Sequence, residues 1–278
     1  MTVAVFMTAC LHDPVDGYYA TRPNLGAGGD FITAPLISQM FGELIGLWAA
    51  QTWLEMDRPA RLLLVELGPG DGTLMSDALR AVGRVPGFLD AVELWLVEPS
   101  APLAALQAQR LGANRAHWVS RLGDVPAGAP MILVANEVLD CLPVRQFVRT
   151  ETGWAERRIG LDEAGALTFG LAPTEALPAA FDKAPVGAVL EQSSAQEALG
   201  AEIGYRLAED GGAALLIDYG RDRFGLGDTL QAVRGHRKVG VLDAPGEADL
   251  TNHADFPAVA AAARDSGCLL YTSDAADE

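Results

Sequence analysis

The stretch that decides the fold is an apolar run that passes into three glycines: Leu62-Leu63-Leu64-Val65-Glu66-Leu67-Gly68-Pro69-Gly70-Asp71-Gly72-Thr73. A continuous apolar run of this length is typical of a buried strand in a parallel sheet. The glycines allow the backbone to turn sharply and to approach a ligand closely, and a helix is expected from about 73 to 82. A strand, a glycine-rich turn and a helix in this order predict a nucleotide-type binding unit.

Strands and helices alternate on both sides of this unit. Further strands are predicted at 93–97, 116–119, 131–135 and 213–218, and further helices at 36–55, 102–111 and 194–209. This alternation favours an α/β fold with a doubly wound, Rossmann-like parallel sheet. Three short antiparallel strands interrupt it, so a β-insert is expected at about 144–190. We expect an N-terminal helical cap over 1–58, the main domain over 59–267, and foreign sequence over 268–278, where no periodic pattern continues.

Composition narrows the class of protein. Half of the 278 residues are hydrophobic, and the net charge is −17. Such a chain repels a phosphate backbone, so we expect no nucleic-acid partner and favour a cationic one. The three cysteines and four histidines lack the spacings of disulfide, zinc or other metal sites, so no metal is expected and a reducing compartment is favoured. No apolar stretch is long enough for a transmembrane helix, and no signal peptide is recognised.

The acids of the glycine turn discriminate between nucleotide ligands. A pyrophosphate at a helix N-terminus would face the carboxylates of Glu66 and Asp71, and each such contact would cost several kcal/mol. S-adenosylmethionine carries no phosphate, and its sulfonium and ammonium groups would be attracted by the same two acids. A nicotinamide oxidoreductase is therefore the weaker alternative, although Gly68 and Gly70 fit its G-x-G pattern. The absence of GK[ST] excludes a P-loop.

Polar residues end two further predicted strands. Glu98 follows the strand at 93–97 and lies 26 residues after Gly72, where a carboxylate can accept both hydroxyls of a ribose. Asn136, Glu137 and Asp140 follow the strand at 131–135, so they are expected to face the reacting methyl group. The alternatives are a solvent-facing acid at 98, and at 136 an ordinary helix start with Asn136 as its cap.

Taken together, these motifs resemble the MidA-like family of class I methyltransferases, over about residues 3–267. The matching segments are Asp16-Gly17-Tyr18-Tyr19, Gly29-Asp30-Phe31-Ile32-Thr33-Ala34-Pro35, Ile37-Ser38-Gln39-Met40-Phe41-Gly42-Glu43, Glu66-Leu67-Gly68-Pro69-Gly70-Asp71-Gly72-Thr73-Leu74, Val97-Glu98-Pro99-Ser100, Asn136-Glu137, Ile217-Asp218-Tyr219-Gly220, Asp228-Thr229-Leu230-Gln231-Ala232 and Asp249-Leu250-Thr251-Asn252-His253.

The resemblance implies transfer of a methyl group from S-adenosylmethionine, which in the mitochondrial complex I assembly factors of the family goes to an arginine of a complex I subunit. For this chain it implies a protein substrate with an accessible arginine, such as a complex I subunit homologue, and a cytoplasmic location unless a mitochondrial presequence is missing. It also implies that the loop holding Asp30 and Thr33 covers the cofactor, next to Glu66, Gly68, Pro69, Gly70, Asp71, Gly72 and Glu98; a plain turn and helix cap is the alternative.

Two departures from the family bear on activity. Leu36 replaces a glutamate that would complete a capping box with Thr33, and family segments expected after Gly267 are absent. A non-catalytic scaffold that binds the cofactor therefore stays open, as does a small-molecule methyltransferase. We expect Glu137, with Asp140, to bind the acceptor guanidinium through paired hydrogen bonds. His253 with Asp255 is a weaker candidate for proton removal.

Overall fold

The computed structural model describes residues 1–21, 34–174, 181 and 183–270. Its contacts divide the chain into two compact units. We call Pro23–Val138, Glu197–Asp218 and Ala258–Glu278 the sheet unit, and Met1–Arg22, Leu139–Gln196 and Tyr219–Pro257 the accessory unit. Neither unit begins or ends at residue 58, where the sequence predicts the end of an N-terminal cap. The division into a cap, a main domain and a foreign tail stays a prediction.

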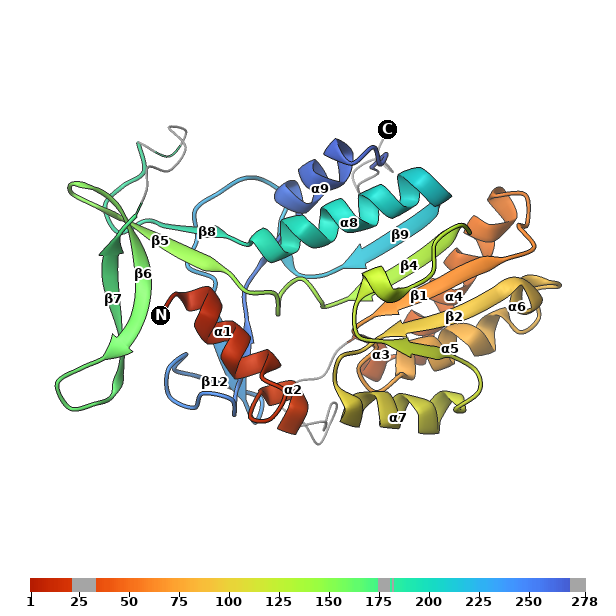
Figure 1. The fold of residues 1–278 in the computed structure, drawn as a ribbon, viewed down its shortest axis with the longest axis horizontal. Coiled ribbons are helices and arrows are strands. Elements are labelled where there is room, and N and C mark those ends of the chain that lie inside the picture. The colour runs from red at the N-terminus through yellow and green to blue at the C-terminus, as the bar shows by residue number, and fades with distance from the viewer. Residues whose placement is uncertain (22–33, 175–180, 182, 271–278) are drawn as a thin grey trace. The chain divides into compact units, whose positions relative to one another are not determined.

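The sheet unit is built on five parallel strands in the order β3-β2-β1-β4-β9 (Figure 1). The strands are β1 (Leu62–Leu67), β2 (Val92–Val97), β3 (His117–Val119), β4 (Met131–Asn136) and β9 (Gly212–Ile217). The helices are α3 (Ala34–Ile37), α4 (Gln39–Glu55), α5 (Thr73–Val82), α6 (Phe88–Ala91), α7 (Ala101–Leu111), the 3₁₀ turn η1 (Leu122–Asp124), α8 (Ser194–Asp210) and α9 (Phe256–Asp265).

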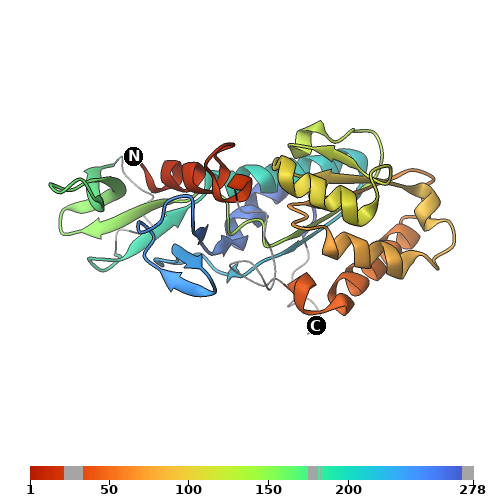
Figure 2. The same cartoon turned by 90° about the horizontal axis from the view of Figure 1, so that it is seen from below.

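Apolar side chains of β1 pack on both faces of this sheet. Leu62 and Leu64 lie in the core cluster that α4 and α5 cover (Figure 2), whereas Leu63 and Val65 lie in the opposite cluster together with Ile203 of α8. All six residues of β1 are buried, as its continuous apolar sequence requires. The predicted doubly wound parallel sheet is therefore confirmed.

The prediction of one unbroken helix over 36–55 is wrong. The chain forms α3 and α4 with a break at Ser38, whose φ of −146° and ψ of 118° are extended. Serine favours this N-cap position because its hydroxyl competes with helical hydrogen bonds, and apolar periodicity does not report such a break. The proposed cap at Thr33 lies outside the described residues, and so does Asp30.

The accessory unit is mainly β-structure. It comprises α1 (Val3–His12), α2 (Tyr18–Thr21), an antiparallel sheet β7-β6-β5-β8, a small antiparallel sheet β12-β11-β13 and the parallel pair β10-β14. The strands are β5 (Arg145–Thr150), β6 (Gly153–Leu161), β7 (Leu167–Pro173), β8 (Val189–Gln192), β10 (Gly220–Arg221), β11 (Gln231–Arg234), β12 (Arg237–Val239), β13 (Asp249–Thr251) and β14 (Ala254–Asp255). The three strands predicted between 144 and 171 are present.

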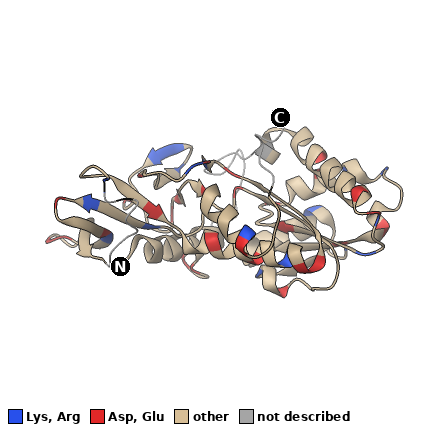
Figure 3. Ribbon diagram, turned by 90° about the horizontal axis from the view of Figure 1, so that it is seen from above, with Lys and Arg blue, Asp and Glu red and all other residues tan. Residues whose placement is uncertain are grey.

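Charged residues of both signs are interspersed along the ribbons (Figure 3). Among the coloured residues of that view, lysines and arginines form no continuous stripe. Within the described part of the chain, no helix combines the length and the apolar character that a membrane crossing needs.

Candidate functional site

The turn after β1 is built by glycines in a conformation that other residues rarely adopt. Gly68, Gly70 and Gly72 have φ values of 59°, 57° and 81°. The amide of Gly72 donates to the carbonyl of Pro69 at 2.9 Å and closes the turn, and α5 begins directly afterwards at Thr73. The positive φ values explain the spacing of the three glycines, because a side chain would be strained there.

Glu66 places an unpaired carboxylate oxygen inside the sheet unit, directly before this turn. Its side chain is 2% exposed, and Oε2 has no hydrogen-bond partner among the described residues. Burial, together with the nearby charges of Asp71 and Glu98, raises the pKa of Glu66 to about 8. Leaving such an acceptor unpaired is costly, so the position fits a ligand that brings a hydrogen-bond donor or a positive charge.

The sequence predicts that the carboxylates of Glu66 and Asp71 both face the ligand, but the carboxylate of Asp71 is bound by groups of the chain itself. Its Oδ2 pairs with the guanidinium of Arg110 at 2.7 Å, and its Oδ1 accepts a hydrogen bond from the amide of Thr73 at 3.0 Å. The charge of Asp71 is therefore balanced by Arg110 of α7. Within the described ranges, Glu66 is thus the acid with a buried carboxylate oxygen that lacks a hydrogen-bond partner.

Glu98 ends β2 and is 8% exposed. Its Oε1 accepts from the amide of Ser100 at 2.8 Å and its Oε2 from the side-chain amide of Gln107 at 3.1 Å. Burial raises the pKa of Glu98 to about 7. Each carboxylate oxygen has a second lone pair, so both oxygens can also accept from the two hydroxyls of a ribose.

Gln107 is a site residue that the sequence analysis missed. It is fully buried, and its amide also donates to the carbonyl of Gly70 at 2.8 Å, so it connects Glu98 to the glycine turn. Its own oxygen accepts from the indole of Trp118 at 2.9 Å. Gln107 is one turn after the buried Leu103 on the same face of α7, and this position is the signal that could have revealed it, since buried amides need such partners.

Asn136 and Glu137 leave the neighbouring strand at the same edge of the sheet. Leu67, the last residue of β1, is paired with Val97 of β2 and with Ala135 of β4. Glu98 and Asn136 each follow directly after these paired residues, so they lie just beyond the end of β1. Oδ1 of Asn136 is buried and has no hydrogen-bond partner in the described parts of the chain. Three adjacent strands thus bring Glu66, Glu98 and Asn136 to the carboxyl edge of the sheet, where open α/β sheets bind their ligands.

Glu137 has an unusual backbone. Its φ is 52°, and its amide donates to the carbonyl of Ile217 in β9 at 2.8 Å. No helix follows, because residues 137–144 form bends and turns, so the alternative of an ordinary helix start capped by Asn136 is wrong. A non-glycine residue held at positive φ is often found where a side chain has a functional orientation.

Asp140 lies in the accessory unit and is 5% exposed. Its Oδ2 accepts a hydrogen bond of 2.5 Å from the hydroxyl of Tyr219, against whose ring His253 lies edge-on. The carboxylate of Asp255 binds Arg221, so its charge is compensated within the accessory unit.

Comparisons with known proteins agree with this geometry. A family described as putative S-adenosyl-L-methionine-dependent methyltransferases matches residues 44–272, which is most of the chain. The chain belongs to this family. The methyltransferase fold and the cofactor S-adenosylmethionine, both predicted from the sequence, are thereby confirmed.

Named relatives and solved structures make the likeness more specific. The mitochondrial protein named protein arginine methyltransferase NDUFAF7 from Danio rerio is 38% identical to this chain, over 92% of the chain and 67% of the relative. The protein of the same name from Mus musculus is 37% identical, over 92% of the chain and 64% of the relative. A crystal structure of a likely methyl transferase from Burkholderia thailandensis, bound to S-adenosyl-homocysteine, is 29% identical with a TM-score of 0.81, covering 96% of this chain and 72% of that one. The chain thus spans about two thirds of these curated methyltransferases.

Proposed function

We propose that this chain transfers the methyl group of S-adenosylmethionine to an arginine side chain of a protein. Two buried oxygens carry the proposal: Glu66 Oε2 and Asn136 Oδ1, which find no hydrogen-bond partner in the described residues and lie on adjacent strands at the carboxyl edge of the sheet. Acceptors without donors suit ligands rich in N–H groups and positive charge. The names of the mitochondrial relatives support arginine as the acceptor.

The residues of the sheet unit fit the cofactor. Glu66 offers an acceptor to a cationic donor, and Glu98 offers two to a ribose. The three glycines let the backbone of the turn approach the nucleoside closely. Pro69 and Asp71 hold this turn closed through Gly72 and Thr73. Asp30 and Thr33 stay candidates for the covering loop. When bound, S-adenosylmethionine supplies a methyl group activated by its sulfonium.

Glu137 is assigned to the acceptor, with Asn136 and Asp140 as further ligands. A carboxylate can hold a guanidinium through two parallel hydrogen bonds, which fixes its plane and localises its charge. One nitrogen is then oriented toward the methyl donor, and orientation contributes much of the rate in such a displacement. The unusual φ of Glu137 aims this side chain differently from a regular strand end.

Labelled methyl transfer to an arginine-containing peptide tests the proposal. The wild-type chain is expected to form N-methylarginine, and Glu137→Gln is expected to lower kcat/KM by about 100-fold because it loses one charge and one acceptor. Glu209→Gln changes an exposed acid of α8 and is the matched control, with activity unchanged. Label on a lysine or a small molecule, or unchanged turnover in Glu137→Gln, would contradict the assignment.

The finer features of the function belong to the same proposal. A complex I subunit homologue as the substrate, and with it a role in complex I assembly, rests on the family resemblance of the motifs. The curated relatives are mitochondrial, whereas we propose a cytoplasmic location for this chain, where cysteine thiols stay reduced. Pull-down with tagged chain in a bacterial host, followed by mapping of methylated arginines, checks the substrate.

A further inference from the structure

The segment Leu139–Pro143 in the accessory unit is held by side chains at every one of its backbone carbonyls. It forms bends and turns rather than a helix or a strand, and the Leu139 carbonyl also accepts from the amide of Leu142 at 3.1 Å. The donors are Gln196 on Leu139 (2.8 Å), Asn252 on Asp140 (2.8 Å) and on Leu142 (2.9 Å), His12 on Cys141 (3.2 Å) and Ser193 on Pro143 (2.8 Å). Five consecutive carbonyls bound by donors from separate elements indicate that the path of this segment is fixed.

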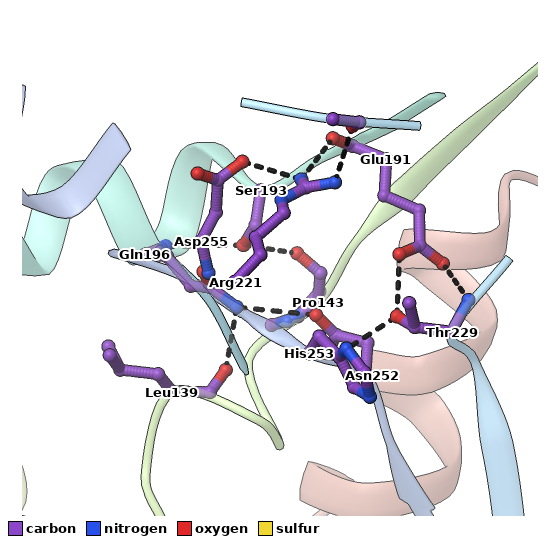
Figure 4. Close-up of polar contacts among 11 residues, drawn as sticks. Leu139, Pro143, Glu191, Ser193, Gln196, Arg221, Thr229, Asn252, His253 and Asp255 are labelled. Atoms are coloured by element: carbon purple, nitrogen blue, oxygen red, sulfur yellow. Dashed lines mark hydrogen bonds and ion pairs between the residues drawn. The ribbon is translucent and has the colours of Figure 1, made fainter. Parts of the chain in front are cut away.

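Asn252 is the centre of this arrangement. It is 1% exposed, and its side-chain amide binds two of the five carbonyls. Its backbone amide donates to the carbonyl of Asp140 at 2.9 Å as well, and its Oδ1 accepts from Gln196 at 3.2 Å. Figure 4 shows Gln196 between Leu139 and Asn252, and Ser193 beside the carbonyl of Pro143.

The same region also fixes the carboxylate of Asp140. The pair β10–β14 aligns Gly220 with Ala254, and the amide of Ala254 donates to the carbonyl of Tyr219 at 3.1 Å. Tyr219 and Asn252 therefore come from neighbouring segments. Tyr219 binds the carboxylate of Asp140 and Asn252 binds its carbonyl.

We infer that Asn252 is a positioning residue which, with Gln196, sets the orientation of the Asp140 carboxylate. This inference rests on the proposed function, in which Asp140 contacts the acceptor. Asn252 touches neither substrate nor cofactor in this account and acts through the backbone of Leu139–Pro143. Its loss would misplace Asp140, while the glycine turn, which belongs to the sheet unit, would keep its structure.

Asn252→Asp is the informative variant, since it keeps the size of the side chain but replaces the donor by oxygens that repel both carbonyls. We expect exchange of the backbone amides of residues 139–142 and alkylation of the half-buried Cys141 to be about tenfold faster. Methyl transfer to the peptide is expected to fall about 10- to 100-fold in kcat/KM, with an unchanged Kd for S-adenosylmethionine. Asn114→Asp is the matched control, because it makes the same change of side chain at an exposed residue of the sheet unit, and we expect wild-type behaviour from it.

The outcomes separate this inference from the proposed function. Wild-type-like exchange, alkylation and turnover in folded Asn252→Asp would overturn it, and so would an equal response in Asn114→Asp. If Asn252→Asp fails to fold, His12→Phe removes one donor and keeps the ring that packs near Tyr19, and faster Cys141 alkylation is again expected. If the wild type does not methylate arginine, the proposed function fails, whereas exchange and alkylation still decide whether Asn252 holds the segment.

Discussion

The affinity for S-adenosylmethionine should rise with pH because Glu66 is largely protonated in the free chain at neutral pH. With a pKa of about 8, the carboxyl is about 3% ionised at pH 6.5 and about 76% ionised at pH 8.5. If the cation binds the ionised form, Kd should fall by about 25-fold over this range, or about 2 kcal/mol. Glu98, with a pKa of about 7, acts in the same direction.

Isothermal titration of the wild type and of Glu66→Gln across pH 6.5–8.5 measures this effect. The ligand's own ammonium titrates equally against both proteins, so the difference between their slopes isolates Glu66. Glu93→Gln removes the charge of a partly exposed acid of β2 that pairs with Arg61, and its dependence of Kd on pH should match that of the wild type. Equal slopes in wild type and Glu66→Gln, or weaker relative binding by the wild type as the pH rises, would refute the reasoning.

The same shifts predict how the stability of the free chain depends on pH. The folded-state pKa of Glu66 and Glu98 is raised, so the folded chain binds more protons than the unfolded chain between about pH 4.5 and 8. Their stabilising contribution is complete below about pH 4.5 and is lost as the pH rises toward 8. Urea unfolding of wild type and Glu66→Gln across this window checks the sign, and a shallower loss is expected in the variant.

Three further changes probe other contacts. Gly212→Ala should cost more than about 2 kcal/mol in urea unfolding, because φ is 120° and the new Cβ would lie 1.9 Å from the Met131 carbonyl oxygen; Gly211→Ala, in open space, should cost less. Glu156→Gln should cost about 1–3 kcal/mol by the same assay, since the buried carboxylate pairs with two half-exposed arginines. Glu98→Gln should weaken S-adenosylmethionine binding by about tenfold in calorimetry through a poorer ribose acceptor, and unchanged affinity would contradict that role.

The sequence predicted best what depends on local pattern. The continuous apolar run placed β1 at Leu62–Leu67, and the glycines placed α5 at Thr73–Val82, both with the observed bounds. A few adjacent residues are enough to encode these two features: a continuous apolar run indicates a strand buried on both faces, and closely spaced glycines indicate a turn with positive φ.

Long-range pairing was beyond the sequence. The ion pair of Asp71 with Arg110 spans 39 residues, and Gln107 reaches Gly70 across 37. The two-residue strands β10 and β14 carry no period of their own, so nothing local marked Asn252 as a neighbour of Asp140. Such contacts arise from the packing of elements that are far apart in the chain, and the sequence indicates only that polar residues occur there.

Separate titrations with S-adenosylmethionine and with NAD test the central claim most directly, namely that a glycine turn backed by the buried acid Glu66 selects a cationic nucleoside. The account predicts saturable binding of S-adenosylmethionine that Glu66→Gln weakens, and no displacement of it by NAD. Binding of NAD at the same turn, with its diphosphate on the amides of Gly70 and Gly72, would contradict the claim.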